Sequence, residues 1–355
     1  MKALILVGGV GSRLRPITHT SAKQLIPVAN IPVLSYVLNS IKEAGITEVG
    51  MVVGATATEI RAAVGDGARF GLNVTYLQQD APRGLADAVL ISRDFLGDDD
   101  FVMYLGDNYV VDGIVDFVED FRRDKAAAQV MLARVDDPRR FGVAELDVDG
   151  RVTAVVEKPQ DPRSDLAIVG VYAFSPLVHQ AVAGIKPSWR DELEITDAVQ
   201  WLVDQGHRVG STVIDRYWKD IAGVDDVLEM NRHVLETVEG RVDGEVDEAS
   251  ELVGRVVVEA GAKITGSRIV GPAVIGPDTV VQDSYVGPFT SIDGNCRIAH
   301  SEIQYSIVLR GASIEGVARV EDSVIGRETE VNAAPRTSTA HRLVLGDHSR
   351  VRVGS

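Results

Sequence analysis

The sequence has a single cysteine, Cys296, in 355 residues, and no hydrophobic run long enough to cross a membrane. One thiol cannot form an intramolecular disulfide or a multi-cysteine metal site, so the sequence suits a reducing compartment. The apolar run 3–7 after Met1-Lys2 ends at two glycines, which makes it too short for the core of a signal peptide. These absences predict a cytoplasmic protein without a membrane partner.

Basic residues are also in deficit, with 36 Lys and Arg against 52 Asp and Glu and a net charge of −16. Such a charge repels nucleic acids and anionic membranes at long range, so no nucleic-acid partner is expected. A phosphate-bearing ligand would need a local cluster of cations. Hydrophobic residues make up 45% of the chain, which excludes intrinsic disorder. At about 150 residues per domain, the length predicts two domains.

Short apolar runs alternate with helical patterns up to about residue 222. The alternation is typical of βαβ units, whose strands are buried on both faces of a parallel sheet. Because the carboxyl ends of parallel strands share one edge, ligand-binding residues are expected on the loops that follow strands. The expected strands are 3–7, 49–53, 74–77, 101–105, 129–135, 152–157 and 168–174, and the expected helices are 33–44, 58–64, 113–123 and 195–205.

The pattern changes after Val224. Apolar spacing there predicts a helix leading out of the first domain, and the acidic segment 239–251 predicts a short hinge. Beyond it, aliphatic residues recur every six positions, which indicates a left-handed parallel β-helix with one aliphatic residue of each hexapeptide inside. We therefore predict domains 1–240 and 241–355. The two six-residue series are Val258, Ile264 and Val270, and Val274, Val280, Val286, Ile292 and Ile298.

The first expected strand ends in a glycine-rich segment, Gly8-Gly9-Val10-Gly11-Ser12-Arg13. Glycines after a strand let backbone N–H groups approach a phosphate or a base, and the arginine behind them supplies charge. A dinucleotide fingerprint would need glycine in place of Leu14, and a Walker loop would need Gly-Lys-Ser/Thr. Neither motif is matched, which leaves another kind of phosphate site or an ordinary tight turn.

The residues that follow complete a longer pattern, with Leu14-x-Pro16-x-Thr18 and then Lys23-Gln24-Leu25-x-Pro27-Val28. This pattern resembles the signature of the sugar-1-phosphate nucleotidylyltransferases, and its Lys-Gln-Leu-x-Pro form is similar to that of the glucose-1-phosphate thymidylyltransferases. Further matches follow in the order found in the family: Gln79-x-x-Pro82-x-Gly84-Leu85-Ala86, Leu105-Gly106-Asp107-Asn108, Phe141-Gly142-Val143, Glu157-Lys158-Pro159, Gly170-Val171-Tyr172, Glu192-x-Glu194-Ile195-Thr196-Asp197 and Trp218-x-Asp220.

The resemblance implies a Rossmann-like α/β nucleotidyltransferase domain with a mixed, mainly parallel sheet. It also implies Mg²⁺-dependent, in-line transfer of dTMP from dTTP to glucose 1-phosphate, with release of pyrophosphate. The added repeat resembles the long form of the enzyme, found where deoxysugars are made for secondary metabolites such as antibiotics. Two substrates with about six negative charges between them repel each other, so positioning and charge neutralisation must supply the catalysis.

The resemblance also implies roles for individual residues. Asp107 and Asp220 would hold Mg²⁺, which prefers hard oxygen ligands. Arg13 and Lys23 would neutralise the nucleotide phosphates, and Lys158 would bind the sugar phosphate. Gln79 and the Gly84 backbone would read a thymine or uracil edge, and Glu157 would accept hydrogen bonds from sugar hydroxyls. The complete expected substrate-binding set is Leu6, Gly8, Gly9, Gly11, Gln24, Gln79, Gly84, Asn108, Gly142, Glu157 and Ile168.

Several alternatives remain open. The base could be uracil, or the sugar mannose or N-acetylglucosamine, and Phe141 in place of a frequent tyrosine leaves the sugar specificity undecided. Contacts of Arg15, Arg190 and Lys219 with substrate are equally open. The chain could instead bind a nucleotide sugar without turnover. His300 in the repeat allows an acyltransferase, although we favour an assembly role for the β-helix in a homo-oligomer.

Overall fold

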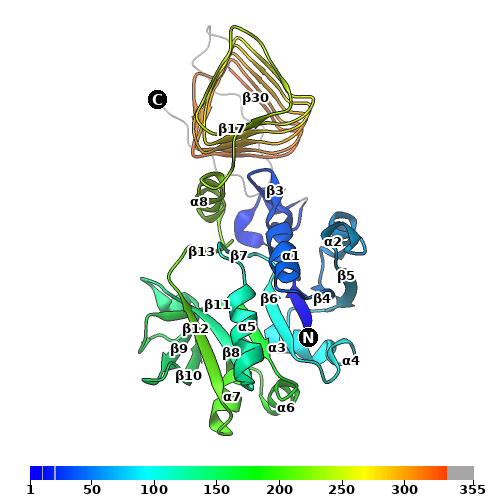
Figure 1. The fold of residues 1–355 in the computed structure, drawn as a ribbon, viewed down its shortest axis with the longest axis vertical. Helices are drawn as coiled ribbons and strands as arrows, with labels where there is room; N and C mark the ends of the chain where they lie inside the picture. Colours follow the sequence, from blue (N-terminus) through cyan, green and yellow to red (C-terminus); the bar gives the residue numbers. More distant parts are fainter. Residues whose placement is uncertain (10, 20, 334–355) are drawn as a thin grey trace. The chain divides into compact units, whose positions relative to one another are not determined.

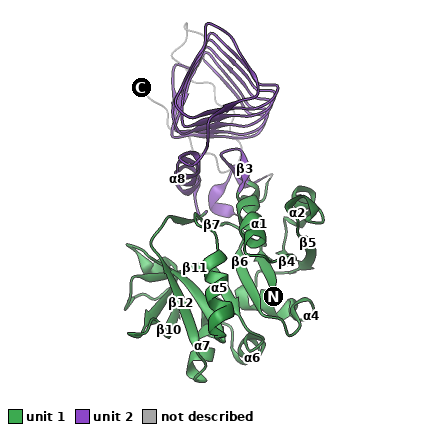
Figure 2. Cartoon of the chain, viewed as in Figure 1, with its two compact units in different colours: residues 1–10, 21–25, 33–220 green, residues 11–20, 26–32, 221–355 purple. Residues whose placement is uncertain are grey.

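The computed structural model describes residues 1–9, 11–19 and 21–333. The chain divides into two compact units, the first comprising residues 1–10, 21–25 and 33–220 and the second residues 11–20, 26–32 and 221–355 (Figure 2). Two short segments near the N-terminus therefore group with the C-terminal part of the chain. The predicted domain boundary at residue 240 remains a prediction.

A nine-stranded mixed sheet forms the centre of the first unit (Figure 1). Four neighbouring strands, in the order β6-β1-β4-β5, run parallel, as the sequence predicts. Strand β11 is antiparallel to β6, β8 and β9, while β12 runs parallel to β8. The strands are β1 (Lys2–Leu6), β4 (Glu48–Val53), β5 (Asn73–Gln78), β6 (Phe101–Leu105), β8 (Ala128–Arg134), β9 (Gly142–Leu146), β10 (Val152–Glu157), β11 (Leu166–Phe174) and β12 (Val209–Ile214).

Helices cover both faces of this sheet. Ile5 and Tyr104 point to one face and pack with α1 (Val33–Glu43), α2 (Ala57–Val64) and α5 (Val115–Asp124). Leu4 and Met103 point to the other and pack with four further helices. Since successive side chains of a strand face opposite ways, both faces are apolar and the unit has three layers. The four helices are α3 (Leu85–Ile91), α4 (Arg93–Leu96), α6 (Val178–Gly184) and α7 (Ile195–Asp204).

Several short elements carry little sequence signal. The most important for the site are β7 (Asn108–Val110) and β13 (Trp218–Asp220), which form a two-stranded antiparallel sheet. Three residues are too few to show a period, so only the pairing of distant segments defines such strands. The others are β2 (Pro27–Val28), β3 (Ile31–Pro32) and the 3₁₀ turns η1 (Ser12–Leu14), η2 (Ile17–His19), η3 (Lys23–Leu25), η4 (Ala68–Phe70) and η5 (Pro138–Arg140).

The second unit contains three stacks of short parallel strands, which confirm the predicted left-handed β-helix (Figure 1). The first stack is β14 (Arg241–Val242), β17 (Val256–Val258), β20 (Ala273–Ile275), β23 (Thr290–Ile292), β26 (Ile307–Val308) and β29 (Val324–Ile325). The second is β15 (Glu245–Val246), β18 (Lys263–Thr265), β21 (Val280–Gln282), β24 (Arg297–Ala299), β27 (Ser313–Glu315) and β30 (Glu330–Asn332). The third is β16 (Glu251–Val253), β19 (Arg268–Val270), β22 (Tyr285–Val286), β25 (Glu302–Gln304) and β28 (Val320–Glu321).

The predicted six-residue register is only partly right. Successive coils are offset by 17 residues at the serine corners, which is less than three hexapeptides, so one side of a coil is a residue shorter. Val286, Ile292 and Ile298 lie in the interior cluster as predicted, but Val270, Val274 and Val280 do not. Their neighbours Ile269, Ile275 and Val281 take those interior positions.

A ladder of serines accompanies this offset. Ser267 and Ser284 each donate their hydroxyl to the backbone carbonyl two residues earlier, at 2.8 and 2.6 Å. Each hydroxyl oxygen also accepts the backbone N–H of the residue 17 positions later, Ser284 and Ser301 respectively. Buried backbone groups at the corner are thereby satisfied, which stabilises a coil of this length.

The segment 239–251 is not the predicted hinge. Its residues 241–242 and 245–246 form β14 and β15, which pair with β17 and β18 as part of the first coil. A terminal coil has a neighbour on one side only, which explains its exposed, acidic composition. Helix α8 (Val224–Leu235) precedes it, and buried Asn231 accepts the backbone N–H of Ala29 at 2.8 Å and the Ser291 hydroxyl at 2.7 Å.

Candidate active site

The carboxyl ends of the parallel strands bring several predicted residues to one edge of the sheet. Gly8 follows β1 by two residues, Gln79 directly follows β5, and Asp107 follows β6 by two. A Cβ atom built on Gly8 would lie 3.6 Å from Oε1 of Gln79 and 3.7 Å from the backbone nitrogen of Gly54, which follows β4. The glycine loop and Gln79, far apart in sequence, therefore line the same space.

The Gln79 side chain is held in one orientation. Its Nε2 donates to Oδ2 of Asp87 at 2.8 Å and to the Gly84 carbonyl at 3.3 Å. Because a carboxylate and a carbonyl only accept hydrogen bonds, the amide nitrogen must face them, and Oε1 is left as an acceptor beside Gly8. Asp87 was not among the predicted site residues. Its one distinguishing feature is that it is buried in the first turn of α3, and this burial can be recognised only once the fold is known.

Gly84 shapes the loop that leads into α3. Its φ is 104°, and a Cβ there would lie 2.3 Å from the Leu193 carbonyl oxygen. The backbones on either side are joined, since Ala86 donates to Leu193 and Leu193 donates to Arg83. Only glycine fits this close approach, which explains why the sequence motif needs it.

Lys23 and Asp107 form an ion pair at the same edge. Nζ of Lys23 contacts Oδ2 of Asp107, and the two side chains are only 18% and 14% exposed. The other carboxylate oxygen, Oδ1, accepts from Nδ2 of Asn108 at 3.0 Å. Asn108 is itself buried, and its Oδ1 accepts the indole N–H of Trp218 at 2.8 Å. Asn108, predicted to bind substrate, thus uses its amide to orient Asp107.

Asp220 is brought beside Asp107 by the β7–β13 pairing. Its Cα is the direct partner of Asn108, the residue after Asp107. Opposed Cα atoms in an antiparallel pair lie about 5 Å apart and consecutive ones 3.8 Å, so the two aspartate Cα atoms are within about 9 Å. That separation allows both carboxylates to reach one ion. Asp107 and Asp220 are 113 positions apart in the sequence, and before the structure only the family resemblance linked them.

Gly9 and Gln24 border the Lys23 side chain. A Cβ on Gly9 would lie 3.0 Å from Cε of Lys23, 3.5 Å from its Nζ and 3.7 Å from Nε2 of Gln24. Gln24 is almost fully buried, and no hydrogen bond to its Oε1 occurs among the described residues. Leu6, the last residue of β1, is also buried. The Lys23 ammonium therefore lies between the Asp107 carboxylate and the glycine loop.

A second group surrounds Gly142 where β9 begins. Glu157, at the end of β10, pairs with Gly142 across the sheet, and its Oε2 accepts from the Thr196 hydroxyl at 3.1 Å. A Cβ on Gly142 would meet Cγ2 of Thr196 at 2.6 Å, Oε2 of Glu157 at 3.3 Å and Cδ1 of Ile168 at 3.4 Å. The predicted residues Glu157 and Ile168 thus both border Gly142, and Thr196 joins them.

Two cations approach the other oxygen of Glu157. Nζ of Lys158 and Nη1 of Arg190 each lie 3.4 Å from Oε1. Arg190 also pairs with Glu192 at 2.8 Å and with Glu194 at 3.4 Å. The sequence left the position of Arg190 open, and the structure brings it to the Glu157 group.

Burial perturbs the acids behind this group. Desolvation raises the pKa of Glu194 above its usual value, despite the lowering effects of the Ser188 hydroxyl and Arg190. The pKa of Asp197, in the first turn of α7, is raised by desolvation and by the Glu157 charge. Perturbed acids gathered around a partly exposed carboxylate are typical of functional sites.

Gly11 and Arg13 belong to the second compact unit. Gly11 has φ 61° and ψ 38° and precedes the turn η1, and its carbonyl accepts the Thr18 hydroxyl at 2.7 Å. Arg13 is exposed within that turn. Their predicted contribution to phosphate binding remains a prediction.

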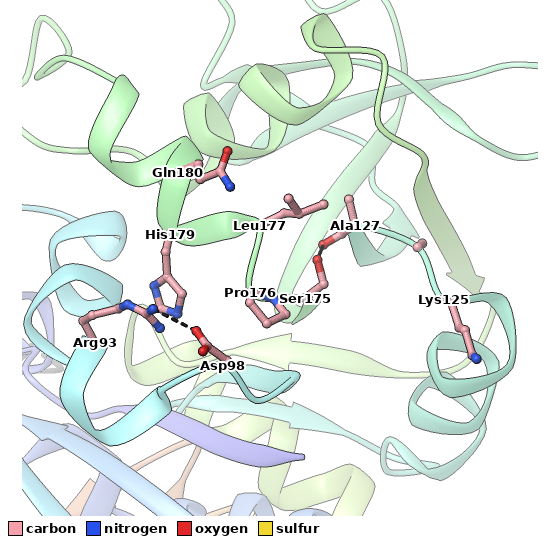
Figure 3. A pocket seen from close by; sticks show the side chains of 10 residues that line it. Arg93, Asp98, Lys125, Ala127, Ser175, Pro176, Leu177, His179 and Gln180 are labelled. Atoms are coloured by element: carbon pink, nitrogen blue, oxygen red, sulfur yellow. Dashed lines mark hydrogen bonds and ion pairs between the residues drawn. The ribbon is translucent and has the colours of Figure 1, made fainter.

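A cavity of about 450 Å³ lies elsewhere in the first unit, beside the end of β11 and the start of β8 (Figure 3). Arg93 and Asp98 on its wall form an ion pair of 2.9 Å, and Lys125, Ser175 and His179 also line it. None of the predicted site residues contributes to it. His300, in the β-helix, is 58% exposed, and its Nδ1 lies 3.8 Å from Oδ2 of Asp283.

The family model described as nucleotidyl transferase matches residues 2–237, about two thirds of the chain and the whole region that contains the predicted catalytic residues. This chain belongs to the nucleotidyl transferase family. Two curated relatives extend the match to full length. They are the glucose-1-phosphate thymidylyltransferases of Streptomyces griseus, 62% identical, and Streptomyces antibioticus, 58% identical, each with 100% of both chains covered.

A solved structure supports the same assignment for this nucleotidyl transferase. It is that of a candidate glucose-1-phosphate thymidylyltransferase from Bacillus anthracis in complex with a sucrose. The match has a TM-score of 0.63 and 35% identity, and it covers 68% of this chain and 98% of the other.

Nucleotidyl transferases of this family generally use a divalent metal. Within the described residues no group of three or more His, Cys, Asp or Glu side chains could hold an ion alone. The Asp107 and Asp220 pair nevertheless fits Mg²⁺, which commonly takes one or two carboxylates and completes its shell with waters and substrate phosphates. Across residues 1–9, 11–19 and 21–333, no helix is long and apolar enough to span a bilayer.

Proposed function

We propose that this nucleotidyl transferase converts dTTP and glucose 1-phosphate to dTDP-glucose and pyrophosphate. The observation that carries the proposal is the order of groups across the sheet, whose strands follow one another as β5-β4-β1-β6-β11-β9-β10. The Gln79 amide follows β5, the Lys23–Asp107 pair lies after β6, and Glu157 with its two cations is at the end of β10. That order matches the base, the phosphates and the sugar of the product. The two full-length Streptomyces relatives, both named for this reaction, support it independently.

The nucleotide base would bind between Gly8 and Gln79. Oε1 of Gln79 is oriented as an acceptor by Asp87, so it suits the imide N–H that thymine and uracil carry. Cytosine has a lone pair at that position and would be disfavoured. Backbone groups of the Gly84 loop would complete the reading of the base edge.

The phosphates would lie along Gly8, Gly9 and Lys23. Glycine there leaves room for backbone N–H groups to approach phosphate oxygens, and the lysine supplies positive charge. We assign Arg13 to the leaving pyrophosphate, because a guanidinium offers a planar fork that matches phosphate oxygens. Asp107 and Asp220 would hold Mg²⁺, which when bound neutralises the charge that develops on the transferred phosphate.

Glucose 1-phosphate would bind at the Gly142 group. Oε1 and Oε2 of Glu157 can accept sugar hydroxyls, and Thr196 fixes the orientation of the carboxylate. Lys158 and Arg190 would bind the sugar phosphate. They would leave Glu157, because the phosphate dianion carries more negative charge than a carboxylate. A phosphate oxygen held there can attack the α-phosphorus in line with the leaving pyrophosphate, so no covalent enzyme intermediate is needed.

A matrix of nucleotides and sugar 1-phosphates, followed by pyrophosphate release, tests the assignment. We expect dTTP with glucose 1-phosphate to give the highest kcat/KM. Faster turnover with UTP would mean that the base assignment is wrong, and faster turnover with mannose or N-acetylglucosamine 1-phosphate would mean that the sugar assignment is wrong. The proposed nucleotidyl transfer would stand in either case. Binding of dTDP-glucose without any turnover would instead support a regulatory binder.

Asp107→Asn tests the metal assignment within this scheme. Loss of one charged ligand should reduce kcat by at least about 100-fold, the range found when a single transition-state contact is removed. The Asn108 contact and the strand pairing remain available, so the variant should keep its fold by circular dichroism. Full activity in Asp107→Asn would place the metal elsewhere.

We further propose that the enzyme is cytoplasmic, supplies deoxysugar synthesis, and assembles as a homo-oligomer through its second unit. Two observations support these proposals: the single buried thiol, and the parallel β-helix, whose first stack begins with β14 and ends with β29 in the part of the chain that the structure describes. Light scattering of the full-length protein should give a mass that is a multiple of 38.2 kDa. A monomer at micromolar concentration would exclude the assembly role.

A further inference from the structure

The Lys23–Asp107 ion pair places two predicted functions in competition. Oδ2 of Asp107 is occupied by the Lys23 ammonium, and Oδ1 accepts the amide of Asn108. Both oxygens of a proposed metal ligand are therefore engaged by the protein itself. A divalent cation that bound Asp107 without displacing Lys23 would lie next to another positive charge in a site that is largely shielded from water.

Lys23 is able to move away, and the destination is adjacent. Lysine carries a compact charge on a flexible four-carbon stem, unlike the rigid fork of arginine. Its Nζ would lie 3.5 Å, and its Cε 3.0 Å, from a Cβ on Gly9. The ammonium thus already borders the loop where we place the nucleotide phosphates. A small rotation of the end of the side chain would exchange the carboxylate for a phosphate.

Asp107, by contrast, is held in place. The chain Trp218 to Asn108 to Asp107 runs from β13 to the end of β6 through hydrogen bonds of 2.8 and 3.0 Å. Asn108 is 2% exposed, so this support is shielded from water. The two members of the pair therefore differ: Asn108 holds the carboxylate in place, whereas the ammonium lies at the end of a flexible side chain.

We infer that Lys23 is an internal counter-ion that closes the Asp107 metal position until a nucleotide arrives. Nucleotide phosphates would draw the ammonium from Asp107, and the exposed carboxylate would then accept the ion. Metal and nucleotide would consequently favour each other's binding, and the empty enzyme would bind a divalent ion weakly. This inference rests on the proposed function, since it takes Asp107 as a metal ligand and Lys23 as a phosphate ligand.

The test is a titration of the nucleotide-free, full-length protein with Mn²⁺, with free ion measured by electron paramagnetic resonance. We expect Lys23→Met, which keeps the length of the stem and removes its charge, to bind Mn²⁺ at least tenfold more tightly than wild type. Lys158→Met is the matched control, because it removes a site cation that pairs with Glu157. Its Mn²⁺ affinity should change no more than twofold.

A double variant locates the ion. Adding Asp107→Asn to Lys23→Met should abolish the gained affinity. Equal Mn²⁺ affinity in wild type and Lys23→Met would overturn the inference, as would a gain that persists in the double variant or a matching gain in Lys158→Met. If Lys23→Met does not fold, Lys23→Gln provides the same comparison with a polar side chain.

The titration uses no substrate, so its outcome is independent of the base and sugar assignments. A failure of the proposed function would appear in the substrate matrix, as absent or different turnover. A failure of the counter-ion inference would appear only in Mn²⁺ binding, with the turnover of dTTP and glucose 1-phosphate intact. The two results can therefore be told apart.

Discussion

Nε2 of Gln79 donates to the Asp87 carboxylate across 2.8 Å, and this contact decides which end of the Gln79 amide faces Gly8. The aspartate is buried, so solvent competes little for its carboxylate. Its effect is to present Oε1 as an acceptor toward the space we assign to the base. The choice between an imide base and cytosine would then depend on a residue that touches neither.

Asp87→Ala should therefore weaken nucleotide binding more than catalysis. Losing a hydrogen bond to a charged group costs about 1.5–3 kcal/mol, so KM for dTTP should rise at least about tenfold while kcat changes little. Asp87→Asn can both donate and accept, which would let the Gln79 amide turn over and narrow the preference for dTTP over CTP. Steady-state kinetics with both nucleotides measures this. Asp94→Ala, an exposed aspartate on α4, is the control and should match wild type.

Thr196→Val should act on the sugar phosphate alone. The substitution keeps the shape of a nearly inaccessible side chain but removes the donor to Oε2 of Glu157, so the carboxylate loses its orientation. We expect KM for glucose 1-phosphate to rise about tenfold, the scale of one charge-assisted hydrogen bond, with KM for dTTP unchanged. Thr196→Ser retains the hydroxyl and should restore binding. An equal defect in the serine variant would mean that packing, rather than the hydrogen bond, is responsible.

The raised pKa of Glu194 predicts a specific pH dependence of stability. Burial raises this pKa above the usual value, so the native protein binds the proton more tightly than the unfolded chain. The free energy of unfolding should consequently fall as pH rises from about 4.3, the unfolded value, through the native pKa. Chemical denaturation at a series of pH values should show this slope in wild type and a smaller one in Glu194→Gln. Identical slopes would contradict the prediction.

Cys296 should report on the integrity of the β-helix. Its side chain lies in the interior cluster, and desolvation raises the pKa of the thiol to about 11, so it stays protonated and shielded at neutral pH. Ellman's reagent should not react with native protein at pH 8 but should label it once denaturant unfolds the coils. Asp243→Cys in a Cys296→Ala background places a thiol on the exposed first coil and should react at once. Prompt labelling of native wild type would argue against the buried position.

Many of the elements with a clear apolar pattern were predicted from sequence, but β9, β12, α3 and α6, of five to seven residues, were not. The run 33–44 gave α1 and the runs 101–105 and 152–157 gave β6 and β10, because burial on known faces imposes a pattern on such lengths. Strands β7 and β13 have three residues each, and they are strands because they pair with each other. The β-helix was predicted correctly, but the register of its interior residues was only partly right. Successive coils are 17 residues apart at the serine corners, whereas the aliphatic spacing predicts 18.

For the candidate site, the residue types could be recognised from the amino-acid order: glycines where a backbone must come close, a lysine, aspartates and a glutamate after strands. Local geometry and charge impose those residue types, so they can be recognised in the sequence. The partnerships between these side chains became visible in the folded chain, which joins Lys23 to Asp107, Gln79 to Asp87 and Glu157 to Thr196. Hydrogen bonds and ion pairs depend on distances of a few ångströms between side chains, and these distances are set by where the fold brings η3, α3 and α7, which carry Lys23, Asp87 and Thr196.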